Sequence, residues 1–62
     1  MINHNTIKKL IQEVKENYNY TYRNITPEVI KEILNLFKEG VEYTNYEQYE
    51  IVEEYILENI AY

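Results

Sequence analysis

Residues 25–41 read ITPEVIKEILNLFKEGV, and they contain the clearest helix signal in the chain. Thr26 is a favoured N-cap, and Pro27 suits the first helical position because its missing N–H has no partner there anyway. Apolar residues then recur with the period of one helical face, at Ile30, Ile33, Leu34, Phe37 and Val41. Gly40 is typical of the left-handed residue just after a helix. We therefore predict a helix from Pro27 to the residue before Gly40, with this stripe in the core.

Two further segments show the same period, one on each side of this helix. The first runs from about Asn5 to Asn17. Its apolar face consists of Ile7, Leu10, Ile11, Val14 and Tyr18. The second begins near Thr44, which has capping-box spacing to Glu47, and runs to about Asn59. Its core face consists of Tyr49, Val52, Ile56 and Ile60. Short connections favour antiparallel helices, so the sequence predicts an all-α fold, a small three-helix bundle that forms a single domain over residues 1–62.

The segment NYNYTYRN, residues 17–24, is the ambiguous part of the chain. Tyr18, Tyr20 and Tyr22 alternate, which is strand spacing. One interpretation is a short two-stranded ribbon that pairs residues near 19–23 with 41–44. The interpretation that we favour is an ordered loop whose tyrosines lie over the bundle.

Size and composition exclude several kinds of site. A chain of 62 residues buries only about 60% of its unfolded surface, so a partner chain is an expected supplement. Cysteine, serine and aspartate are absent, which excludes disulfides, thiolate metal sites, serine nucleophiles and EF-hand calcium loops. His4 is the single histidine and has no second metal ligand beside it. We expect no enzyme activity, no metal and no cofactor.

Location and nucleic-acid binding can be addressed from the same composition. No apolar run is long enough to span a membrane, and the first residues lack the layout of a secretory signal, so we expect a cytoplasmic protein without membrane contact. The basic side chains are few and dispersed, and the last helix carries glutamates that phosphates would repel. We therefore expect no direct binding to nucleic acid.

Charge is divided unevenly along the chain. Residues 1–38 hold six basic side chains and four glutamates, a net charge of +2, whereas residues 39–62 hold seven glutamates and nothing basic, a net charge of −7. On a helical wheel, four glutamates of the last helix fall within about 80° of one another. These residues, called here the glutamate stripe, are Glu47, Glu50, Glu54 and Glu58.

The glutamate stripe is unfavourable for the stability of its own helix. Glu50, Glu54 and Glu58 are like charges four residues apart, and each such pair costs about 0.2–0.5 kcal/mol. Glu58 also lies at the negative end of the helix dipole. Tyr46, Ile51 and Tyr55 accompany the stripe, and an acidic strip with tyrosine and aliphatic neighbours is typical of a contact surface.

Two interpretations of the stripe remain open at this point. In the first, lysines of the same chain neutralise it inside the folded bundle; the candidates are Lys8, Lys15, Lys31 and Lys38. In the second, the stripe and its apolar neighbours bind a basic surface of another protein, such as a nuclease or another nucleic-acid-binding protein. The partner-binding residues would then be Glu47, Glu50, Glu54, Glu58, Tyr46, Ile51 and Tyr55.

In size, charge and composition, without a shared motif, the chain resembles the small acidic proteins by which phages and mobile elements block host defence nucleases, including anti-CRISPR proteins. That resemblance implies an inhibitor that mimics nucleic acid and, if it is phage-encoded, acts in the cytoplasm of the host cell. The alternative function is a self-associating structural or regulatory protein. Its homodimer interface would consist of Val29, Leu36, Ile51, Tyr55 and Leu57.

Overall fold

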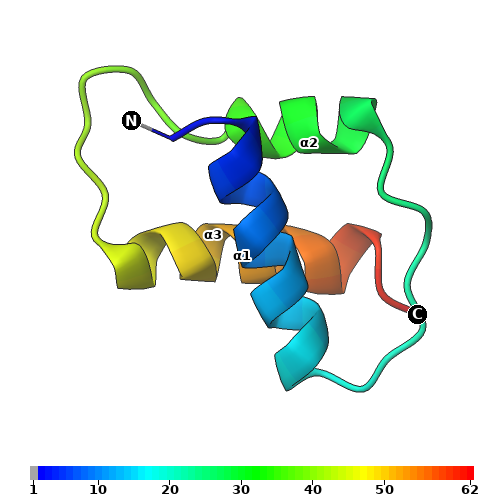
Figure 1. Cartoon of the computed structure of the whole chain (residues 1–62). Helices are drawn as coiled ribbons and strands as arrows, with labels where there is room; N and C mark the ends of the chain where they lie inside the picture. The colour runs from blue at the N-terminus through cyan, green and yellow to red at the C-terminus, as the bar shows by residue number, and fades with distance from the viewer. Residues whose placement is uncertain (1) are drawn as a thin grey trace.

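The protein is a bundle of three helices, α1 (His4–Asn17), α2 (Pro27–Leu34) and α3 (Asn45–Asn59). These elements come from a computed structural model that describes residues 2–62. Figure 1 shows α2 and α3 running in opposite directions, with α1 crossing their direction. Helix α1 packs against both of the others. The predicted all-α three-helix fold is confirmed, but the prediction that all three helices are antiparallel is wrong, because the connection over residues 18–26 is long enough for α1 to cross.

Each helix begins with a side-chain cap, and Thr26 and Thr44 are the caps that the sequence predicts for α2 and α3. The Asn3 side chain accepts a backbone N–H of the first turn of α1 at 3.0 Å. The Thr26 hydroxyl does the same for α2 at 3.3 Å. Helix α3 has a complete capping box, in which Thr44 Oγ1 accepts from Glu47 N at 3.1 Å and Glu47 Oε1 accepts from Thr44 N at 2.9 Å. These bonds satisfy N–H groups that have no partner within the helix.

Helix α2 ends earlier than predicted, at Leu34. The backbone then tightens, because the N–H groups of Leu36 and Phe37 bond to carbonyls only three residues back. Gly40 has the predicted positive φ, 76°, but it lies in a turn of the connection and not at the end of the helix. Val41 is 49% exposed, so its predicted place in the core is wrong.

Tyr43 provides the physical reason for this early end. Its hydroxyl accepts the backbone N–H of Lys38 at 2.9 Å, which replaces the bond that Lys38 would make within a continuing helix. The Tyr43 ring also packs edge-on against Phe37, with ring centroids 5.1 Å apart. The connection therefore folds back on itself and leaves Val41 outside.

The core is aliphatic and draws on all three helices. The buried side chains are Ile7, Leu10, Ile11, Val14, Ile30, Ile33, Val52, Ile56 and Ile60. Each of them belongs to a predicted core stripe. The predicted Tyr18, Leu34, Phe37 and Tyr49 pack against this core but stay partly exposed.

The tyrosine segment pairs with the end of the chain. Tyr22 and Ala61 form a single antiparallel bridge, and Arg23 N donates to Ile60 O at 2.9 Å. Tyr62 N donates to Thr21 O at 2.8 Å. In Figure 1 the C-terminus accordingly lies beside the connection between α1 and α2. The loop interpretation is confirmed, whereas the proposed ribbon with residues 41–44 is wrong. A sequence with several strand-like segments does not show which of them will meet.

Candidate functional site

The glutamate stripe lies on the outer face of α3. Glu47, Glu50, Glu54 and Glu58 are all exposed. The buried residues of the same helix, Val52 and Ile56, point the other way, toward the core. The helical period therefore places the four side chains on one exposed face, about one turn apart from the first turn to the last turn of the helix.

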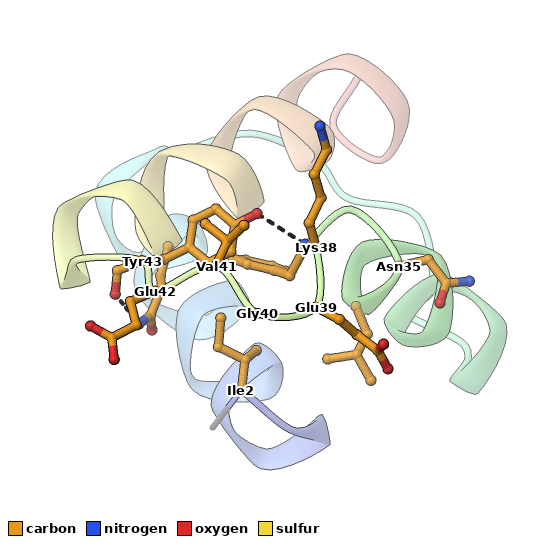
Figure 2. Close-up of a pocket in the computed structure, with 11 residues that line it drawn as sticks. Ile2, Asn35, Lys38, Glu39, Gly40, Val41, Glu42 and Tyr43 are labelled. Atoms are coloured by element: carbon orange, nitrogen blue, oxygen red, sulfur yellow. Dashed lines mark hydrogen bonds between the residues drawn. The ribbon is translucent and has the colours of Figure 1, made fainter.

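The cations of the described chain do not pair with this stripe. Across residues 2–62, no lysine or arginine nitrogen lies within 4.0 Å of a glutamate oxygen. Lys15 Nζ instead lies 5.6 Å from the centre of the Tyr22 ring, and Arg23 lies 5.3 Å from that of Tyr62. Figure 2 shows the Lys38 side chain extending away from the nearby carboxylates of Glu39 and Glu42. Among the residues described, the first interpretation of the stripe therefore has no direct ion pair to support it.

Two glutamates outside the stripe and one within it are partners of tyrosine hydroxyls. Tyr18 donates to Glu53 Oε2 at 2.9 Å, joining the end of α1 to α3. Tyr55 donates to Glu32, joining α3 to α2. The hydrogen bond to the carboxylate raises the pKa of both tyrosines, because ionisation would place a second negative charge beside the first. Hydrogen bonding with Glu50 likewise raises the pKa of Tyr46, a side chain that is 72% exposed.

A groove lies beside the C-terminal half of the stripe. We call it the α3 groove. It has a volume of about 350 Å³ and is lined by Leu36, Ile51, Glu54, Tyr55, Glu58 and Asn59. Four predicted site residues therefore meet there, namely Ile51, Glu54, Tyr55 and Glu58. The other three, Tyr46, Glu47 and Glu50, lie toward the start of α3, outside the groove.

Two residues of the α3 groove were not among the predicted binding residues. Leu36 was expected only in the homodimer interface, and it reaches the groove because α2 ends before it. Asn59 lies at the last position of α3 and donates from Nδ2 to the Tyr55 carbonyl at 3.1 Å. No sequence signal identifies Leu36 as a lining residue of the groove, since its position there depends on where α2 stops. Asn59 follows Tyr55 by one helical turn, and this spacing is the only sequence signal that places Asn59 beside Tyr55 in the groove.

A larger groove, of about 970 Å³, lies under the connection between α2 and α3 (Figure 2). Its apolar lining consists of Ile2, Leu34, Phe37 and Val41, and its polar residues include Tyr43 and Gln48. Gln48 is held there by its bond from Nε2 to the Tyr43 carbonyl at 3.0 Å. The lining carries charges of both signs, on Lys38, Glu39 and Glu42, and so it shows no preference for a cationic or an anionic partner.

Within residues 2–62 no three His or Glu side chains are arranged to hold a metal ion. None of the helices in that range is both long and apolar enough to cross a bilayer.

No protein-family model, curated protein or solved structure matches the chain. The assignment of function therefore depends on the charge, exposure and shape of the site itself.

Proposed function

We propose that the protein is a small acidic protein-binding module that docks the glutamate stripe of α3 on a basic surface of another protein. The observation that carries this proposal is the exposure of Glu47, Glu50, Glu54 and Glu58 on one helix face, together with the α3 groove beside them. Exposed charges of one sign attract a partner of the opposite sign, and the apolar groove provides area to bury once the two meet.

The cost of the stripe to the helix also supports this role. Glu50, Glu54 and Glu58 repel one another along α3, and no basic residue lies in the last turn of this helix. By contrast, α1 has Lys15 in its last turn and α2 has Lys31. A partner that supplied the missing positive charge would remove the repulsion on binding.

The partner in this proposal is a nuclease or another nucleic-acid-binding protein, and the module is its inhibitor. Carboxylates repeating about every 5.4 Å, one helical turn, form a line of negative charge comparable to a phosphate backbone. A cationic surface built for nucleic acid would attract that line by long-range electrostatics. The module would then compete with nucleic acid, in the manner of the small anti-defence proteins that the composition resembles.

The test compares two charge reversals of equal size. Glu50→Lys with Glu54→Lys changes the stripe, and Glu13→Lys with Glu16→Lys makes the same change on exposed positions of α1. The partner is identified by pull-down from the source cell with mass spectrometry and then purified. Its affinity for each variant and its activity on nucleic acid are measured at several salt concentrations.

We expect the stripe variant to lose binding and inhibition, and the α1 variant to keep both. Affinity for the unaltered chain should fall as salt rises, because exposed charges are screened over about 10 Å at 0.1 M. Circular dichroism should show equal helicity in all variants. Inhibition that survives in the stripe variant would contradict the proposal.

The exposed apolar lining of the α3 groove favours a second candidate, self-association. Leu36 is 46% exposed beside Ile51 and Tyr55, as an interface between two copies would require. In a two-fold dimer, however, Glu54 and Glu58 of one copy would face the same glutamates of the other. That repulsion makes a basic partner the better fit. Sedimentation velocity at micromolar concentration separates the two, since a strict monomer excludes the dimer.

A further inference from the structure

We infer that the α3 groove receives one arginine side chain of the partner protein. This inference rests on the proposed function and specifies what the partner presents at this point.

The size of the groove suits a single side chain. Its volume, about 350 Å³, lies at the lower end of the range of about 300–1,000 Å³ for small-molecule sites. One wall is Leu36, which projects from the turn after α2, and the other is α3. An extended side chain can lie between them while its backbone stays outside.

The apolar part of the groove suits a long aliphatic stem. Leu36 is 46% exposed and Ile51 is half-buried, so both present carbon surface to an occupant. The Tyr55 ring forms a third surface, and its hydroxyl is already engaged with Glu32. This bond fixes the ring and leaves its face, not its hydroxyl, as the feature that an occupant meets.

Most polar atoms of the groove are acceptors. Glu54 and Glu58 are exposed, lie four residues apart and have carboxylates that only accept hydrogen bonds when ionised. Asn59 gives one of its two Nδ2 hydrogens to the Tyr55 carbonyl, which leaves Oδ1 as an acceptor and one N–H as a donor. A phosphate or carboxylate would meet two like charges and a single remaining N–H, whereas a cation rich in N–H groups would find several acceptors.

Arginine fits these features better than lysine. Its planar guanidinium has five donors and can bond to two carboxylates at once, and it stacks on aromatic faces such as that of Tyr55. Its aliphatic carbons would cover Leu36 and Ile51. Lysine presents a compact, strongly hydrated charge that gains less from a flat aromatic surface or from paired carboxylates.

The experiment uses two blocked tripeptides, acetyl-Gly-Arg-Gly-amide and acetyl-Gly-Lys-Gly-amide, as probes. Each is titrated into the full chain at low salt, and the methyl signals of Leu36 and Ile51 are followed by NMR. We expect the arginine peptide to bind about fivefold more tightly than the lysine peptide and to shift these methyl signals more.

Three variants locate the binding. Glu58→Gln removes a carboxylate of the groove, and Glu50→Gln removes one from the same stripe outside the groove. The first should weaken the arginine peptide by about fivefold and the second by less than about twofold. Leu36→Ala, at an exposed turn position, should reduce the preference for arginine without unfolding the chain.

The outcomes separate this inference from the proposed function. Equal affinity for the two peptides, or equal effects of Glu58→Gln and Glu50→Gln, would overturn the arginine site. The proposed function would then still stand or fall by the partner binding of the Glu50→Lys, Glu54→Lys variant. Loss of partner binding in that variant alongside a failed arginine preference would mean that the stripe binds by charge alone.

Discussion

At the scale of single residues, tyrosine hydroxyls form several of the hydrogen bonds that connect separate helices. Tyr18 connects the end of α1 to Glu53, and Tyr55 connects α3 to Glu32. Asn17 Nδ2 donates to the Tyr49 hydroxyl at 2.8 Å, which adds a second link between α1 and α3. The abundance of tyrosine in this chain therefore has a structural cause as well as the binding role that we propose.

These hydroxyl bonds predict a loss of stability at high pH. The pKa of Tyr18 and of Tyr55 is raised above 10.0 in the folded chain, so the folded state holds these protons more tightly than the unfolded state. Stability from these bonds is complete below the unfolded pKa and is lost as pH rises through the folded pKa. We expect the urea midpoint, measured by circular dichroism, to fall as the pH rises above about 10, the ordinary pKa of tyrosine.

Matched variants identify the source of this pH dependence. Tyr18→Phe should flatten the fall, since it removes the hydroxyl that donates to Glu53. Tyr62→Phe is the control, because Tyr62 is 72% exposed and keeps its ring over Arg23 when the hydroxyl is lost. Identical pH profiles for the two variants would contradict the assignment.

At the scale of the element, α3 combines a strong start with an unfavourable surface. Its capping box satisfies the first turn, and Val52 and Ile56 anchor it in the core. The glutamate stripe acts against these contributions through repulsion along the helix. An element selected only for stability would carry positive charge at some of these positions.

This conflict predicts that a change can stabilise the protein while weakening its function. Glu54→Lys replaces two repulsive pairs, with Glu50 and Glu58, by two attractive ones. We expect the free energy of unfolding to rise by about 0.5–1 kcal/mol in urea denaturation, and partner affinity to fall. Glu13→Lys, which changes the net charge by the same two units at an exposed position of α1, is the control for net charge. A destabilised Glu54→Lys variant would show that the stripe supports the fold.

At the scale of the whole molecule, a small aliphatic core supports all three helices. Ile7, Val14, Ile33, Val52 and Ile56 are fully buried. A domain of this length has a net stability of only about 3–9 kcal/mol. Each core side chain therefore contributes a large share of that stability.

Because the core is small, we predict that the free energy of unfolding falls steeply when a core side chain is shortened. Ile56→Val should cost about 0.5–1.5 kcal/mol, whereas Ile56→Ala should cost about 2–5 kcal/mol and leave much of the chain unfolded at 37 °C. Leu36→Ala is the control, because Leu36 is exposed and lines a groove outside the core. Urea denaturation followed by circular dichroism gives the three values. A mild effect of Ile56→Ala would mean that the packing around it relaxes into the space.

The sequence by itself determined where the helices begin and which side chains they bury. Caps and helical periods act within a few residues, so Thr26, Thr44 and the apolar stripes predict these features without knowledge of the rest of the chain. The same period predicts that the four glutamates of α3 share one face. Local chemistry is sufficient for all of these features.

Only the tertiary structure decided where α2 ends, which segment pairs with Tyr22, and that a groove forms beside the stripe. The end of α2 depends on Tyr43 folding back on Phe37 and Lys38. The pairing of Tyr22 with Ala61 joins residues that are 39 positions apart in the sequence. The α3 groove requires the early end of α2 to place Leu36 across from Ile51 and Tyr55. These features depend on contacts between separate elements, and such contacts exist only after the helices have packed.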